Sequence, residues 1–230
     1  MATGRMADAG TDRHPRTGHE GWRQLPVWVV GLILVCCVIE AAIIGLTLTG
    51  MADARQIATI YGGFWTELLA GNWLPAYAAQ PVVMFFSYGL LHGGVLHLAM
   101  NMISLAVVAR ELVRLVGAGW MAVIYLISQL AAAGLFAAMA PGPAPMVGAS
   151  GAIFGLAGAL VVLVALLRRR RGQPMAPLWR AVANIVVLNL GLTLLAPGIA
   201  WQAHLGGAIA GMACGLLLWL LFVPKQPMAK

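Results

Sequence analysis

The chain has 230 residues, of which 61% are hydrophobic and 9% are charged, and its formal net charge is +7 at pH 7. Soluble domains carry about 25% charged residues and about 45–50% apolar ones. The composition therefore excludes an ordinary soluble domain and predicts an integral membrane protein, because runs of about 20 apolar residues cross a bilayer.

Six apolar runs follow one another along the chain. They are residues 27–48, 95–108 (with an apolar approach from residue 82), 120–139, 151–167, 178–195 and 203–223. We expect each run to form one membrane-spanning helix. The predicted fold is therefore all-α, a polytopic membrane protein built as a bundle of six transmembrane helices.

The two ends of the chain differ from the rest in composition. Residues 1–24 are polar and Gly-rich, and we expect a disordered cytoplasmic tail there. They do not resemble a signal peptide, because the apolar run that follows is too long for one. Residues 25–223 then form a single membrane domain, and residues 224–230 form a short cytoplasmic tail.

Basic residues predict the orientation of the bundle. With a cytoplasmic N-terminus and six crossings, every Lys and Arg except Arg55 lies on the cytoplasmic side, as the positive-inside rule requires. We expect a multi-pass protein of the bacterial inner membrane. The run of arginines at 168–171 suits contact with anionic lipid head groups, and we expect no nucleic-acid partner.

The long outer connection, residues 49–94, is rich in Trp and Tyr, which suits a segment lying along the outer leaflet. Cys36, Cys37 and Cys214 lack metal-ligand spacing and are interpreted as packing residues. Glu40 is the one acid well inside a span. It is interpreted as a buried, hydrogen-bonded or protonated packing residue, with a functional role as the alternative.

Polar side chains within the spans gather near the outer ends of three helices. His97 and Asn101 are four residues apart and share one face of the second helix, Ser150 opens the fourth and His204 opens the sixth. Each is costly in hydrocarbon, so their common depth predicts a single site. His92, just before the second span, is interpreted as structural.

A serine and a histidine at one depth suggest a nucleophile with its general base. Small residues let two helices approach closely, and these helices carry them at helical spacing: Gly151, Gly155 and Gly158 on the fourth, and Gly207, Gly211 and Gly215 on the sixth. No acid lies near either residue in sequence, which favours a Ser150–His204 dyad. His97, Asn101 and the Ser150 N–H would then donate to a developing oxyanion.

Simpler interpretations remain open at this stage. A membrane serine often bonds back to a helix carbonyl, and His97 and Asn101 could instead join two spans by a structural hydrogen bond. Two other intramembrane chemistries are disfavoured, because the chain has no HExxH motif and no Asp within a span. We therefore expect neither a metal nor a cofactor.

Three motifs in order carry a family resemblance. "HGGVLHLAMN" at 92–101, "GASGAIFG" at 148–155 and "AHLGGAIAG" at 203–211 resemble the rhomboid intramembrane serine proteases, and the resemblance extends over about residues 27–223. It implies a six-helix bundle with a water-filled cavity open to the outer face. It also implies substrates that are transmembrane segments of other membrane proteins.

The resemblance also assigns roles to single residues. Ser150 would be the nucleophile of the GxSG motif that begins at Gly148, and His204 would be its base. His97 and Asn101 would support the oxyanion, and Phe154 would stack on His204. The chain departs from the family in its first outer loop, where "QPVVMFF" stands at about the place of a common Trp–Arg pair, and "AVVARELVRLVG" around Glu111 matches the family only loosely.

Two alternatives to a protease follow from the same residues. A rhomboid-like pseudoprotease would bind membrane clients without cutting them, but such relatives usually lack the serine or the histidine, and both are present here. A small transporter would need polar residues along a path through the whole membrane, whereas the polar set here stops near one face. The sequence specifies no oligomeric state.

Overall fold

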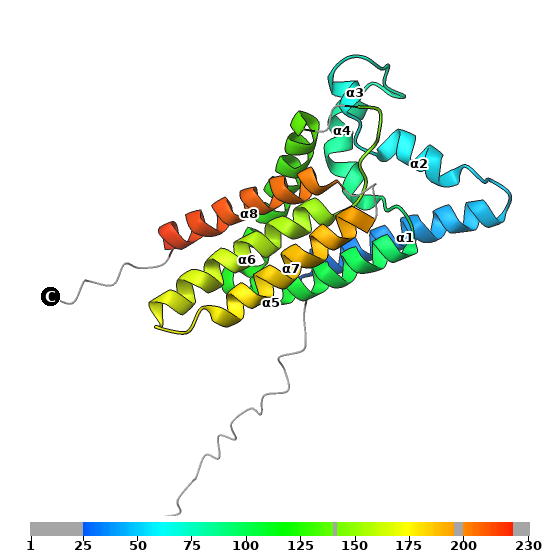
Figure 1. The fold of residues 1–230 in the computed structure, drawn as a ribbon. Coiled ribbons are helices and arrows are strands. Elements are labelled where there is room, and N and C mark those ends of the chain that lie inside the picture. The colour runs from blue at the N-terminus through cyan, green and yellow to red at the C-terminus, as the bar shows by residue number, and fades with distance from the viewer. Residues whose placement is uncertain (1–24, 140–141, 196–199, 223–230) are drawn as a thin grey trace, which may run out of the picture.

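The computed structural model describes residues 25–139, 142–195 and 200–222, without the side chains of 188–190 and 192–195. Its elements in chain order are α1 (Val27–Leu48), α2 (Ala54–Gly62), α3 (Thr66–Leu69), α4 (Gln80–Ser87), the 3-10 turn η2 (Tyr88–Leu90), α5 (Val95–Met139), α6 (Ser150–Arg170), α7 (Ala176–Leu195) and α8 (Trp201–Phe222). The long helices α1, α5, α6, α7 and α8 form a bundle in which α8 lies along the second part of α5, with Gly206 against Ala131 and Leu135, and α2, α3 and α4 gather at one end of this bundle (Figure 1).

The described helices confirm an all-α, polytopic fold. Four of them are long and apolar enough to cross a membrane, namely α1, α5, α6 and α8. The side chains of α7 are described continuously only over Ala176–Val187, and this shorter stretch is apolar. The bounds of α1 coincide with the predicted run 27–48. Residues 1–24 and 223–230, which include the two predicted tails, lie outside the described residues.

The second and third predicted spans are joined in a way that the sequence analysis did not anticipate. Runs 95–108 and 120–139 belong to one element, α5, of 45 residues, whose one non-helical position is Gly117 at φ 78° and ψ 166°. The intervening segment 109–116 is helical because it consists mainly of good helix formers, and Glu111 and Arg114 pair at 3.6 Å along it. Only a glycine tolerates the backbone conformation at position 117. The arms 95–116 and 118–139 are thus two helices that meet at a kink at Gly117, and each contains one of the two predicted runs.

The core of the bundle is formed where α5, α6 and α8 pack against one another. Leu105, Leu112, Ile124 and Leu156 are fully buried there. Large apolar side chains are also turned outward on several helices: Val38 is 66% exposed, Val187 69% and Leu217 55%. A surface of this kind is unfavourable in water and suits contact with lipid chains.

A second apolar cluster attaches the outer connection to the end of the bundle. Phe64 is fully buried and packs edge-on against Phe85, Tyr88 and Phe136, with ring centroids 5.0, 5.9 and 6.2 Å away. The Tyr88 hydroxyl donates to the Gln129 carbonyl at 2.8 Å. Aromatic pairs of this geometry contribute more to the stability of the fold than the burial of their apolar area alone would give. The cluster therefore holds η2, and with it the start of α5, in place. That residues 49–94 lie along the outer leaflet stays a prediction.

Candidate active site

Ser150 and His204 lie in contact. Ser150 is the first residue of α6, and His204 is in the first turn of α8. The His204 Nε2 is 2.8 Å from the Ser150 Oγ, a hydrogen-bond distance at which a proton can pass between the two atoms. Both residues are half-buried, so the pair is neither sealed in the core nor open to the surface.

Glycines bring the two helices together. A methyl group built on Gly207 would overlap the Gly151 carbonyl, and one built on Gly211 would overlap the Gly155 carbonyl. On α6, a methyl group on Gly158 would lie 2.6 Å from the Ala208 carbonyl oxygen. The backbones of α6 and α8 therefore touch along three successive turns, which no larger residue would permit.

Phe154 lies against the ring of His204. The two rings are stacked, with centroids 4.5 Å apart and planes 11° from parallel. Phe154 is one turn beyond Ser150 on α6, so the same helix presents the hydroxyl and the surface that orients the imidazole. Stacking limits rotation of the His204 ring away from Ser150.

His97 approaches the serine from α5. The residue between them is Gly148, at φ +121°, whose N–H donates to the Tyr88 carbonyl at 2.9 Å. A methyl group built on Gly148 would lie 2.9 Å from Cε1 and 3.0 Å from Nε2 of His97, and 3.8 Å from the Ser150 Oγ. The Nε2 edge of His97 thus faces the turn that leads into Ser150.

Asn101 lies one turn further along α5 and is 5% exposed. Its Nδ2 donates to the His97 carbonyl at 2.9 Å, while its Oδ1 has no hydrogen-bond partner among the described residues. The structure therefore brings Ser150, His204, Phe154, Gly148 and His97 together, and it ties Asn101 to the backbone of His97 instead. An oxyanion role for Asn101 stays a prediction.

Comparison with known proteins identifies the family of this chain. The family described as "Rhomboid domain" matches residues 79–221, more than half of the chain. The chain belongs to the rhomboid family. The match confirms the resemblance carried by the three motifs and, with the apolar helices, makes this rhomboid a multi-pass membrane protein.

Several curated proteins are similar to this rhomboid. Rhomboid protease GluP of Bacillus subtilis is 35% identical over 167 residues, covering 73% of this chain and 29% of that protein. RHOMBOID-like protein 4 of Arabidopsis thaliana is 35% identical over 173 residues, covering 75% and 39%. Inactive rhomboid protein 1 of Drosophila melanogaster is 29% identical over 141 residues, covering 61% and 9%. This rhomboid thus spans less than half the length of these relatives.

Three of the four acids in the described ranges have other partners. Glu40 pairs with Arg55, Glu67 accepts from the Asn72 amide at 2.6 Å, and Glu111 pairs with Arg114. Within the described ranges, no three His, Cys, Asp or Glu side chains are grouped so that they could hold a metal ion. The absence of a third catalytic member stays a prediction.

Sequence reasoning missed the environment of Arg55. It placed Arg55 alone on the outer side and left the role of Glu40 open, yet the two form an ion pair that also holds the His92 carbonyl. Glu40 is buried and hydrogen-bonded, as expected, and whether it is only a packing residue is not decided by these contacts. The signal that could have found the pair was a single acid inside a span, together with a single cation on the outer side.

His92 is buried beside His97. It is 3% exposed, and its ring meets that of His97 edge-on at 5.3 Å. Burial, with a smaller contribution from His97, lowers the pKa of His92 to about 4, so the ring is neutral at pH 7. Neither ring nitrogen has a hydrogen-bond partner in the described part of the chain. The His92 carbonyl makes the polar contact with Arg55, and a structural role for the ring stays a prediction.

Proposed function

We propose that this rhomboid is an intramembrane serine endopeptidase that cleaves transmembrane segments of other membrane proteins through a Ser150–His204 dyad. The observation that carries the proposal is the 2.8 Å contact between Ser150 Oγ and His204 Nε2. Family membership, with a relative named Rhomboid protease GluP, supports the same chemistry. The outward apolar faces of the helices support a substrate that is itself in the bilayer.

The reaction follows from the roles of the two side chains. His204 Nε2 accepts the Ser150 proton while Oγ forms a bond to the scissile carbonyl carbon, whose oxygen takes the electron pair. The tetrahedral intermediate collapses as the imidazolium returns its proton to the leaving amine, and an acyl ester on Ser150 remains. Water, deprotonated by His204, then hydrolyses the ester and restores the serine.

The oxyanion is stabilised by donors on two elements. The Ser150 N–H lies at the start of α6, where backbone N–H groups lack helical partners. His97 presents its Nε2 edge to the same turn, across Gly148. Donors held in place before the reaction stabilise charge without reorganisation, which is why their geometry matters more than their number.

A pseudoprotease is the second candidate within the family. One similar protein is named Inactive rhomboid protein 1, so membership alone does not imply cleavage. The specific observation that favours a protease is the hydrogen bond between Ser150 and His204, whose ring stacks on Phe154. A transporter would need polar groups along the whole bundle, and the ones gathered here are near one end.

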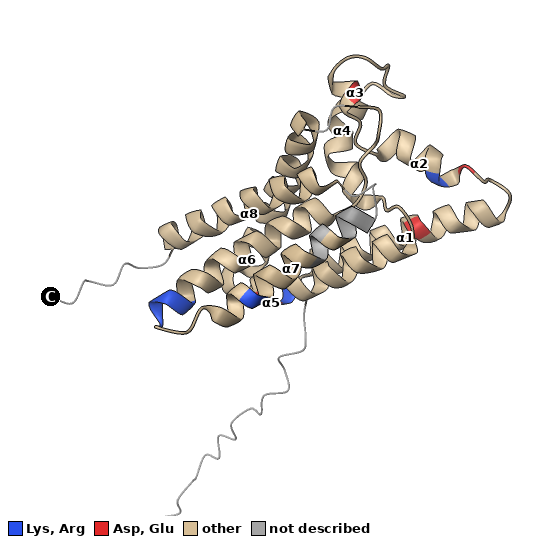
Figure 2. Cartoon of the chain, viewed as in Figure 1, with Lys and Arg blue, Asp and Glu red and all other residues tan. Residues whose placement is uncertain are grey.

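The charges support an orientation with a cytoplasmic N-terminus. Described Arg residues gather toward the end of the bundle where α6 ends and α7 begins (Figure 2). In the described chain, these cations include Arg168, Arg169 and Arg170 in the last turn of α6. Under the positive-inside rule this end is cytoplasmic, which puts Ser150 near the opposite face. The relatives come from a bacterium, a plant and an insect, so a bacterial inner membrane stays a prediction.

Cleavage of a model transmembrane substrate by the purified protein tests the proposal. We expect Ser150→Ala, His204→Ala and the double variant each to lose at least about a thousandfold in kcat, because nucleophile and base act as one unit. Ser128→Ala is the matched control: this serine is fully buried on α5, its hydroxyl has no hydrogen-bond partner in the described chain, and kcat should not change. Product masses locate the cut bond.

Two outcomes would contradict the proposal. Turnover of Ser150→Ala at the wild-type rate would show that another group attacks the substrate. A folded wild-type protein that binds the substrate and leaves it intact would instead support the pseudoprotease.

A further inference from the structure

Glu40, about two turns before the end of α1, and Arg55, in the first turn of α2, form a forked ion pair. Arg55 Nη1 lies 2.9 Å from Glu40 Oε2, and Nη2 lies 2.6 Å from Oε1. Glu40 is 3% exposed, while the Arg55 side chain is 35% exposed. Because Nη1 and Nη2 each donate to a different carboxylate oxygen, the ion pair holds the Arg55 guanidinium in one orientation.

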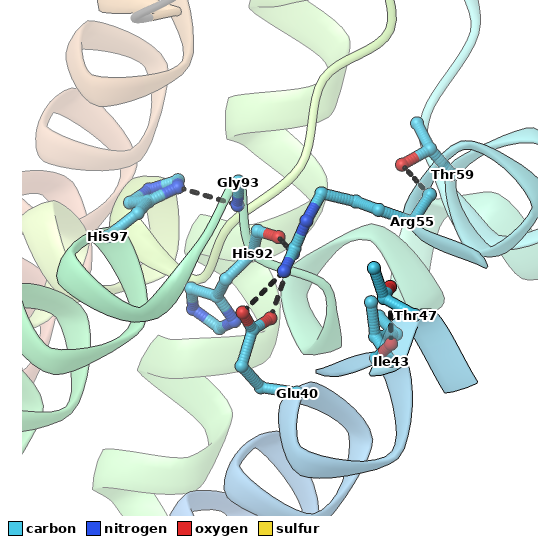
Figure 3. Close-up of polar contacts among 8 residues, drawn as sticks. All are labelled: Glu40, Ile43, Thr47, Arg55, Thr59, His92, Gly93 and His97. Atoms are coloured by element: carbon cyan, nitrogen blue, oxygen red, sulfur yellow. Dashed lines mark hydrogen bonds and ion pairs between the residues drawn. The ribbon is translucent and has the colours of Figure 1, made fainter. Parts of the chain in front are cut away.

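The same Arg55 nitrogen reaches a third group. Nη1 also donates to the His92 carbonyl oxygen at 2.6 Å, so α1, α2 and the turn before α5 meet at one guanidinium (Figure 3). This turn contains Gly94 at φ +136° and is followed at once by Val95, the first residue of α5. The contact fixes the plane of the His92–Gly93 peptide, because the oxygen that accepts belongs to that peptide.

The other side of that peptide contacts His97. The Gly93 N–H donates to His97 Nδ1 at 3.1 Å (Figure 3). The His92 C=O and the Gly93 N–H are the two ends of one peptide group, so a cation bound to the oxygen polarises the N–H and strengthens its hydrogen bond. The connected groups are thus Glu40, Arg55, the His92–Gly93 peptide and the His97 ring.

The hydrogen bond decides which nitrogen of His97 carries a proton. A neutral imidazole has one N–H, and a nitrogen that accepts a hydrogen bond cannot be the one that bears it. Since Nδ1 accepts from Gly93, the proton is on Nε2, the edge that faces Gly148 and Ser150. In the other tautomer, Nε2 would present a lone pair to the oxyanion and repel it.

We propose that Glu40 and Arg55 are positioning residues, which hold the His92–Gly93 peptide so that His97 keeps its donor N–H directed at the oxyanion position. The effect on turnover rests on the proposed protease function. The effect on the tautomer does not, because it depends only on the hydrogen bonds between these groups. The ion pair therefore has a role beyond joining α1 to α2.

The test replaces both members of the pair at once. Glu40→Gln/Arg55→Met removes both charges, which avoids leaving one charge buried without its partner. The matched control is Glu111→Gln/Arg114→Met, which removes the same two charges from a pair whose side chains are both 53% exposed. The ring nitrogens of His97 are observed by 15N NMR on histidine-labelled protein in detergent micelles, and assigned by comparison with His97→Gln.

We expect the wild type and the control to show the Nε2–H tautomer alone, and the double variant to show a substantial fraction of Nδ1–H. With a model transmembrane substrate, kcat of the double variant should fall about tenfold while KM and the melting temperature stay close to those of the control. A pair that only joined two helices would lower the melting temperature and leave the His97 ring signals unchanged.

Should the double variant not fold, Arg55→Lys gives the same readouts, because it keeps a cation opposite Glu40 and loses the fork that also reaches His92. The positioning role is overturned if His97 stays in the Nε2–H form and kcat is unchanged in a folded variant. If the tautomer shifts but the wild-type protein cleaves nothing, the positioning role stands and the proposed protease function fails.

Discussion

Gly148 shows how closely the groups around Ser150 are spaced. It lies between His97 and Ser150 and has a backbone conformation, φ +121°, that side chains rarely adopt. It also leaves no room for a methyl group on the side of His97. At the scale of single residues, the candidate site depends on the lack of a side chain at Gly148 as well as on the side chains of Ser150, His204 and His97.

Comparing Gly148→Ala with a control variant separates the effect of backbone strain from the effect of the added methyl group on His97. We expect Gly148→Ala to lower kcat by about tenfold or more, because the added methyl group displaces His97 from the position where an oxyanion donor acts. Gly50→Ala is the matched control: Gly50 has φ +103°, and its added methyl group would meet nothing within 4 Å. Both glycines have a φ that side chains rarely adopt, so backbone strain of about 1–3 kcal/mol is present in both variants.

The comparison is made on kcat and melting temperature together. Loss of activity in Gly148→Ala with a melting temperature equal to that of Gly50→Ala would support the proposed placement of His97. Equal activity in the two variants would show that His97 does not act at the serine.

At the scale of elements, the contact between α6 and α8 brings the nucleophile and the base together. The two side chains come from residues 54 positions apart, and their distance depends on backbones that touch at Gly151 and Gly207 and at Gly155 and Gly211. Membrane helices gain little from burying apolar surface against each other, so close packing supplies much of their attraction. A change in helix spacing therefore alters stability and catalysis at the same time.

Gly211→Ala tests this contact. Its methyl group would overlap the Gly155 carbonyl, and we expect the protein to lose about 1–3 kcal/mol of stability and most of its activity. Gly134→Ala, within α5, is the control: its methyl group would meet nothing within 4 Å, and Ala is the better helix former. Thermal unfolding in detergent and substrate cleavage are measured for both.

A Gly211→Ala protein as stable and active as Gly134→Ala would show that α6 and α8 do not approach as closely as described. Loss of stability in both variants alike would assign the effect to the substitution of glycine in general.

At the scale of the whole molecule, charge and apolar surface point to the same arrangement in a bilayer. Outward apolar side chains surround the bundle, and described cations gather at the end opposite the connection 49–94 (Figure 2). Arg55, on the other side, is held by Glu40 instead of standing alone.

Single cysteines test the orientation in intact cells. In a background with Cys36, Cys37 and Cys214 replaced by Ala, we expect Asn72→Cys to react with a membrane-impermeant maleimide. Gln173→Cys should react only after lysis, because the positive-inside rule puts it in the cytoplasm. Both positions are exposed, so access to the reagent differs only by side of the membrane. If Gln173→Cys were labelled in intact cells and Asn72→Cys were not, the proposed orientation would be wrong and the opposite one correct.

The spans and the candidate dyad could be predicted because lipid constrains a sequence strongly. A helix in hydrocarbon needs a continuous apolar run, which is why 27–48 coincides with α1. Polar side chains are costly there, so the few that occur, such as Ser150 and His204, are conspicuous. Where the chain approaches the membrane surface this constraint weakens, and the helix through 109–116 was missed because polar residues are equally acceptable in a loop or a helix there.

The membrane class, the approximate spans, the family and the residues of a possible serine site could all be inferred from the amino-acid sequence. The three-dimensional packing placed Ser150 and His204 2.8 Å apart and Gly148 between His97 and the serine. It alone joined Glu40 to Arg55 and Arg55 to His92, across 15 and 37 positions of the chain. The physical reason is that apolar periodicity acts within one helix, whereas a hydrogen bond between helices depends on how closely and at what rotation their backbones pack.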